Sequence, residues 1–202
     1  HWMVHSFPTR RSSDLMLYNA AFILMLASPV LTMRLVSEEK KSKTIELLLT
    51  SPISPFEIIA GKFLACFVLY LVLMILTLQY PLILAHYSQD FDLGPIYSGY
   101  LGLVLLGAAY ISLGLFASTL TENQIIAAMV SFGGLVLFWI FGWARHAFEN
   151  DFGELLGNLS LFDRYAEFLR GIVDSGNVIF FVVFTTVWLF LAMRVLESDR
   201  WR

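Results

Sequence analysis

The side chains that could do chemistry in this sequence are few and scattered. His86 and His146 have no second histidine or cysteine at ligand spacing, which favours interfacial histidines over a metal site. The single cysteine, Cys66, lies in an apolar run, which excludes a disulfide or a cysteine metal site within one chain. The sequence also lacks a Walker-type glycine-rich loop for ATP. We therefore predict no enzyme activity and no catalytic, cofactor-binding or metal-binding residue.

A charged segment between two apolar stretches is the feature best suited to a mechanical role. Residues 37–51 read SEEKKSKTIELLLTS, with charges first and leucines last, and Pro52 follows. The segment is too short and too charged to cross a membrane, so we expect a helix that lies on the membrane surface. A force applied there would tilt both neighbouring spans, which favours coupling to a soluble partner. A surface helix without any partner is the alternative.

The composition indicates a membrane protein. Hydrophobic residues make up 58% of the 202 residues, charged residues only 14%, and the mean hydropathy is +0.72. An ordinary soluble domain carries roughly a quarter charged residues. Five stretches without Asp, Glu, Lys or Arg are each 19 or more residues long, and about 20 apolar residues form a helix that crosses a bilayer. We predict an all-α polytopic transmembrane helix bundle with five spans, at about 15–36, 57–85, 95–120, 123–143 and 178–195.

The polar content of these spans limits the possible functions. The net charge of -3 argues against nucleic acid as a partner, because phosphate binding needs a basic patch. Proton- or ion-coupled carriers use charged residues inside the membrane, whereas the polar residues at depth here are Asn19, Gln79 and scattered serines and threonines. A self-sufficient secondary carrier is therefore disfavoured. A membrane anchor or assembly scaffold without transport fits the composition as well as a transport function does.

Short motifs predict where two of the helices begin. Ser54, Pro55 and Glu57 have the spacing of a capping box with proline at the first helical position. Thr119 and Glu122 have the same spacing and predict a second helix start.

The span at about 95–120 is rich in small residues. Gly99, Gly102, Gly107 and Gly114 leave little side chain on parts of its surface, and such residues let membrane helices approach one another closely. We predict that these four glycines are helix-packing positions. Glycines that lipid tolerates at random are the alternative.

An amphipathic helix is predicted within the longest polar stretch, residues 145–177. Ser160 and Asp163 have the spacing of a helix cap at the start of LFDRYAEFLRGIV. Its apolar side chains recur at helical spacing and are Leu161, Tyr165, Phe168, Leu169 and Ile172. This apolar stripe is expected to lie on the membrane surface or to pack back into the bundle.

Lysines and arginines fall unevenly on the two sides of the membrane. One side carries Arg34, Lys40, Lys41, Lys43, Lys62, Arg194, Arg200 and Arg202, and the other carries Arg145, Arg164 and Arg170. By the positive-inside rule, the loop 37–56 and the carboxyl tail are predicted to be cytoplasmic. The amphipathic helix is then expected outside.

The first residues look foreign to the rest of the chain. Residues 5–15, HSFPTRRSSDL, look like the translation of a sequencing-library adapter. We therefore expect residues 1–15 to be a non-native leader and residues 16–202 to form a single transmembrane domain. An ordinary basic leader is the alternative.

The segment from Pro29 to Ala65, PVLTMRLVSEEKKSKTIELLLTSPISPFEIIAGKFLA, resembles a region of ABC-2 type permeases. These proteins are the membrane subunits of ATP-binding-cassette transporters, and the region follows their second transmembrane helix. The sequence is similar in particular to the group that includes the gliding-motility and nitrous-oxide-reductase maturation permeases. The resemblance continues, in order, through LGPIYSGYLGLVLLGAAYISLGLFASTLTENQIIAA, LSLFDRYAEFLRGIVD and RVLESDRWR.

This resemblance implies the permease subunit of an export system in the bacterial plasma (inner) membrane. ATP hydrolysis is then expected in a separate nucleotide-binding ATPase subunit. Two permease copies, identical or different, are expected to pair in the lipid bilayer. Family members have six spans, so the first is expected to be missing from this sequence. The substrate stays unknown.

In this family, a cytoplasmic coupling helix docks on the ATPase, and it maps to the charged segment. The resemblance implies partner contacts by Glu38, Glu39, Lys40, Lys41, Lys43, Thr44, Ile45, Glu46, Leu47 and Leu48. Replacement of Glu39 and Glu46 by lysine is therefore expected to abolish association with the ATPase and to leave membrane insertion intact.

Overall fold

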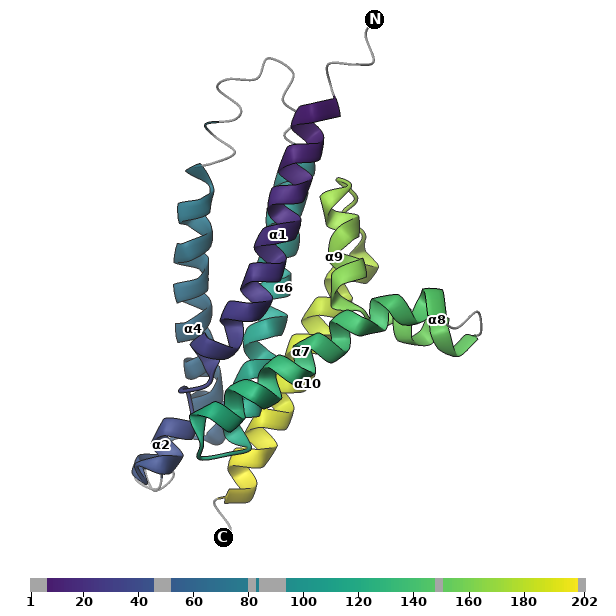
Figure 1. The fold of residues 1–202 in the computed structure, drawn as a ribbon. Helices are drawn as coiled ribbons and strands as arrows, with labels where there is room; N and C mark the ends of the chain where they lie inside the picture. The colour runs from purple at the N-terminus through teal and green to yellow at the C-terminus, as the bar shows by residue number, and fades with distance from the viewer. Residues whose placement is uncertain (1–6, 46–51, 80–82, 84–93, 148–150, 200–202) are drawn as a thin grey trace, which may run out of the picture.

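The chain folds into helices that run mostly side by side. A computed structural model describes residues 7–45, 52–79, 83, 94–147 and 151–199. Its helices are α1 (Phe7–Thr32), α2 (Ser37–Lys41), α4 (Pro55–Thr77), α6 (Gly94–Thr119), α7 (Gln124–Ala147), α8 (Asp151–Asn158), α9 (Leu161–Leu169) and α10 (Ser175–Asp199) (Figure 1). No strand occurs within these ranges. The predicted all-α class is confirmed.

Five helices in the described residues are long and apolar enough to cross a membrane, and they correspond to the five predicted spans. The bounds differ modestly. Helix α4 ends at Thr77, where a span to about 85 was expected, and α10 continues to Asp199. Helix α1 begins at Phe7 and so includes part of the expected leader. The non-native origin of that leader stays a prediction.

Only one of the two predicted capping boxes forms. The Ser54 hydroxyl accepts a hydrogen bond from the Glu57 backbone, and the Glu57 carboxylate accepts one from the Ser54 backbone at 2.8 Å, with Pro55 at the first helical position. The prediction at Thr119 is wrong, because this residue still belongs to α6 and is fully buried. Asn123 precedes α7 instead, and its side-chain oxygen accepts from the Ile125 backbone at 2.9 Å.

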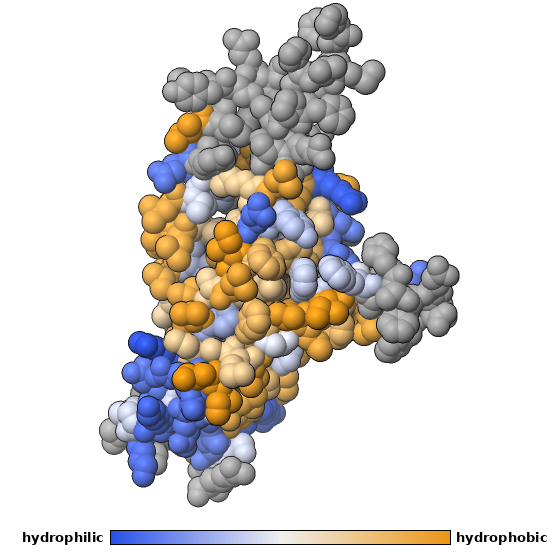
Figure 2. Space-filling model, in the orientation of Figure 1, coloured by the Kyte–Doolittle hydropathy of each residue, from blue (hydrophilic) through white to orange (hydrophobic). Residues whose placement is uncertain are grey.

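Helix α6 is the centre of the bundle. It packs against α1, α4, α7, α9 and α10, and in Figure 1 it lies behind α1 and between α4 and α9. In its most apolar window 72% of the residues are buried, against 17% to 33% in the other candidate spans. The other spans therefore surround α6 and present their remaining apolar surface outward, as Figure 2 shows along the flank formed by α4.

The two ends of α6 contact different elements. At its last residue, Thr119, lie α2 and the carboxyl-terminal end of α10, and we call this end of the bundle the elbow end. Polar residues gather there over α2 (Figures 1 and 2). At the first turns of α6 lies α9, where the Ser98 hydroxyl donates to the Phe168 carbonyl at 2.7 Å. We call this opposite end the α9 end.

The amphipathic helix packs back into the bundle. Ser160 caps α9 by accepting a hydrogen bond from the Asp163 backbone at 3.2 Å, as predicted. The buried side chains of α9 are Leu161, Phe162, Tyr165, Phe168 and Leu169. Ile172 does not belong to this buried stripe, because α9 ends at Leu169 and Gly171 turns the chain with a φ of 82°. Ile172 is 54% exposed.

Candidate functional site

The charged segment forms a bent connection after α1, and we call residues 33–45 the elbow. Its helix, α2, has only five residues, Ser37–Lys41, so the predicted helix over 37–51 is interrupted. The interruption lies at Ser42 and Lys43, where Lys43 adopts a left-handed φ of 56° and its backbone N–H donates to the Lys40 carbonyl at 3.1 Å. Ile45 then turns inward and is buried.

The first turn of α2 is capped by a residue of α6. Val36 precedes α2 and supplies no side-chain cap. Instead the Ser118 hydroxyl accepts hydrogen bonds from the backbone N–H groups of Val36 and Ser37, both at 3.0 Å. The same hydroxyl donates to the Met33 carbonyl at 3.1 Å. Ser118 is fully buried, so this one side chain fixes the start of α2 against the end of α6.

Lys40 joins α2 to two further helix ends. Its Nζ lies 2.5 Å from the backbone oxygen of Thr119, the last residue of α6, and 2.5 Å from Oδ2 of Asp199, the last residue of α10. The Lys40 side chain is only 12% exposed. This ammonium therefore has its partners within the chain.

Lys62 of α4 connects that helix to the elbow. Its Nζ lies 2.5 Å from Oε1 of Glu39 and 2.6 Å from the Leu35 carbonyl. The second oxygen of Glu39, Oε2, is buried and has no hydrogen-bond partner among the described residues. The elbow end also contains an apolar cluster, which consists of Val36, Ile45, Ile58, Ile59, Leu115, Ala192 and Leu196.

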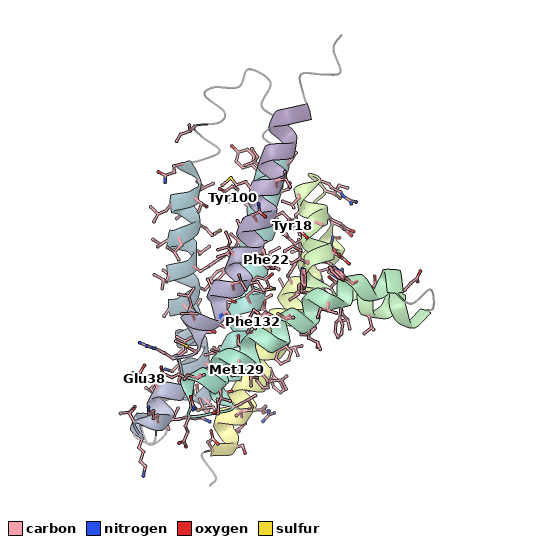
Figure 3. All side chains as sticks on the ribbon, viewed as in Figure 1. Tyr18, Phe22, Glu38, Tyr100, Met129 and Phe132 are labelled. Atoms are coloured by element: carbon pink, nitrogen blue, oxygen red, sulfur yellow. The ribbon has the colours of Figure 1, made fainter. Side chains whose placement is uncertain are left out.

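The structure divides the predicted coupling residues into two groups. Glu39, Lys40 and Ile45 face the bundle through the contacts described above. The exposed residues are Glu38, Lys41, Lys43 and Thr44, and Figure 3 shows Glu38 on α2 at the elbow end. Glu46, Leu47 and Leu48 lie outside the described residues. The substitution Glu39→Lys would therefore break an ion pair within the chain, which makes it a poor probe of partner binding.

Each of the four α6 glycines faces a side chain from a neighbouring element. A Cβ at Gly102 would lie 2.8 Å from Cβ of Phe168, and one at Gly107 would lie 2.6 Å from the Tyr70 hydroxyl oxygen. Gly99 faces Leu17 and Gly114 faces Thr32 in the same way. Real Cβ atoms do not approach other atoms so closely, so a larger residue at any of these positions requires its neighbour to move.

Cavities lined by described residues do not identify a substrate. One of about 270 Å³ at the α9 end has polar walls that include Asp163, Arg164 and Glu167. Another, of about 290 Å³, lies between α4 and α10 and is lined mainly by apolar residues such as Ile59 and Leu189. The described residues contain no cluster of three or more His, Cys, Asp or Glu side chains that could hold a metal ion.

Sequence reasoning missed the residues that anchor the elbow. Ser118 and Asp199 had no local signal, because a serine near a helix end and an aspartate in a charged tail are both ordinary. Lys62 did carry a signal, since it is the single cation of a helix whose other charged residue is Glu57 in the first turn. A paired role at the membrane boundary could have been inferred from that position.

A family model described as an ABC-2 family transporter protein matches residues 6–163. The match includes the elbow and most of the described helices and begins within the expected leader. No curated protein matches the chain.

Proposed function

Because the chain belongs to the ABC-2 transporter family, whose membrane proteins work with ATP-binding subunits, we propose that the elbow is the docking site for such a subunit. The chain is a multi-pass membrane protein of this transporter family. In the proposed arrangement, it forms the membrane pathway of an exporter with a second permease copy in a bacterial plasma (inner) membrane. ATP hydrolysis takes place in the partner.

The observation that carries this proposal is the division of the elbow into an anchored side and a free side. Glu39, Lys40 and Ile45 hold it to the bundle. Glu38 and Lys41 present charges of opposite sign to the surroundings. A partner that moves this free side would transmit the movement to the helix ends behind it. A lipid-surface helix without a partner needs no such anchoring.

Association with the ATPase tests the docking site directly. The double variant Glu38→Lys/Lys41→Glu reverses both exposed charges and leaves the internal ion pairs intact. We expect it to insert normally and to bind its ATP-binding subunit about tenfold more weakly or worse, because like charges across an interface cost several kcal/mol. The measurement is a pull-down from membranes with quantified subunit ratios.

The matched control is Glu154→Lys, an exposed charge reversal on α8 that should leave association unchanged. Equal binding by the elbow variant and the unaltered chain would contradict the docking site. Absence of any associated ATPase would favour a membrane anchor or scaffold instead.

The proposed orientation places the elbow and the carboxyl tail in the cytoplasm. With Cys66 replaced by alanine, we expect Lys43→Cys to react with a membrane-impermeant maleimide only after cells are permeabilised, because the charged elbow faces inward. Ile172→Cys, at the α9 end and 54% exposed, should react in intact cells. Labelling of Lys43→Cys from outside would contradict contact with any cytoplasmic ATPase.

A further inference from the structure

We propose that α2 and the elbow end of α6 move as one body, so that α6 carries the movement of the elbow into the bundle, with Lys40 as the positioning residue. This inference rests on the proposed function, since the movement originates in the ATP-binding subunit. A simpler mechanism would move only α1 and α4, the helices that precede and follow the elbow in the chain. The contacts at the elbow end favour α6.

Helices α2 and α6 cap one another. The Ser118 hydroxyl of α6 accepts from two backbone N–H groups at the start of α2, which would otherwise be left without partners at a helix amino terminus. In return, Lys40 of α2 donates to the Thr119 carbonyl at the end of α6. Each helix therefore completes the hydrogen bonding of the other, and separating them would leave buried polar groups unpaired.

Electrostatics reinforce this contact. The carboxyl terminus of a helix carries a partial negative charge that a nearby cation stabilises. Within their described bounds, neither α6 nor α10 has a basic residue in its last turn, and Asp199 adds a further negative charge to the end of α10. The Lys40 ammonium contacts both ends. The connection to α4 also has one ion pair and one carbonyl contact, because Lys62 pairs with Glu39 and donates to the Leu35 carbonyl. What sets α6 apart is the buried Ser118 hydroxyl, which has no counterpart on α4 among the contacts described above.

The position of α6 makes it suited to transmit movement. A helix of 26 residues is about 39 Å long at a rise of about 1.5 Å per residue. It contacts α1, α4, α7 and α10 along its length, and α9 at its far end through the Ser98–Phe168 hydrogen bond. A displacement of its elbow end is therefore expected to shift α9 at the opposite end of the bundle.

The test places a reporter at the far end of α6. Tyr97 is 70% exposed there, so Tyr97→Cys in a Cys66→Ala background reports movement through its rate of maleimide labelling. In the complex with the ATP-binding subunit, we expect ATP to change this rate. Lys40→Met, which keeps the apolar stem and removes the charge, should reduce the ATP-dependent change about fivefold or more, as expected when the coupling between two sites is lost.

Three comparisons make the result decisive. Lys40→Met should still bind the ATPase in a pull-down, which separates lost transmission from failure of the docking site. Lys40→Arg should restore the ATP-dependent change, because it keeps the charge. Arg194→Met, which removes an exposed cation at the same end of the bundle, should have no effect. An unaltered ATP response in Lys40→Met, or no response at position 97 in the otherwise unaltered chain, would overturn the inference.

A second measurement needs no partner. In the full chain in lipid nanodiscs, Lys40→Met should speed amide hydrogen exchange both in α2 and in the last turn of α6, because the two segments open together. Faster exchange in α2 alone would show that the two helices move separately and would also overturn the inference.

Discussion

Replacing Gly107 by leucine is expected to separate α4 from α6 and to destabilise the bundle strongly. Even a Cβ at this position would lie 2.6 Å from the Tyr70 hydroxyl oxygen. Tyr70 cannot simply turn away, because it is 2% exposed and its hydroxyl donates to the Leu103 carbonyl at 2.7 Å. Leucine would therefore break that hydrogen bond, displace the ring, or push the two helices apart.

The size of the effect follows from overpacking. Extra methylene groups in a packed core cost about 3 kcal/mol at the upper end of the usual range, and each kcal/mol lowers the Tm of a chain of this size by about 2–4 °C. We expect Gly107→Leu to lower the Tm in detergent by roughly 6–12 °C. The measurement is the fraction of monodisperse protein that remains after heating.

A matched glycine provides the control. A Cβ at Gly133 on α7 would have no described atom within 4 Å apart from its chain neighbours and its own helix backbone. Gly133→Leu should therefore leave the Tm unchanged or raise it, because leucine favours helix more than glycine does. The double variant Gly107→Leu/Tyr70→Ala should recover part of the loss. Equal losses at positions 107 and 133 would show that α6 and α4 do not pack closely.

The spans were predictable because hydrocarbon leaves the chain few choices. A charged side chain is costly in the bilayer, so stretches without charge, such as those around Tyr70 and Gly107, locate the spans directly. Their ends were less predictable. The same capping motif begins a helix at Ser54 but not at Thr119, since burial of Thr119 at the end of α6 decides its environment. Spacing alone carries no information about that burial.

The anchoring of the elbow was not predictable from local patterns. Lys40 lies 79 positions from Thr119 and 159 positions from Asp199 in the sequence, and Val36 lies 82 positions from Ser118. The order of residue types along the segment showed that it was charged at its start and apolar at its end. Only the fold shows which of those charges are paired inside the chain, and this division separates Lys40 from Lys41.

The Glu39–Lys62 pair leads to the second large effect. Lys62→Met removes the cation 2.5 Å from Oε1 of Glu39, while Oε2 already lacks a hydrogen-bond partner among the described residues. The substitution therefore leaves a partly buried carboxylate without its counter-charge. Breaking a fully buried ion pair costs about 3–5 kcal/mol. Because the Glu39 side chain is 32% exposed, we expect a smaller cost of about 2 kcal/mol, within the range for an unsatisfied buried group.

A double-mutant cycle distinguishes this charge effect from loss of packing. Glu39→Gln in the Lys62→Met background removes the unpaired charge, so the double variant should be more stable than Lys62→Met alone, and the two costs should not add. The comparison pair is Arg194–Glu197, which has a similar separation of 2.8 Å but side chains that are 58% and 42% exposed. Arg194→Met should cost only about 0.3–0.5 kcal/mol, as for other exposed pairs on one helix. Additive losses at Glu39 and Lys62 would mean that the two residues stabilise the elbow independently, and the link between α2 and α4 would then rest on the apolar cluster around Val36 and Ile58 instead.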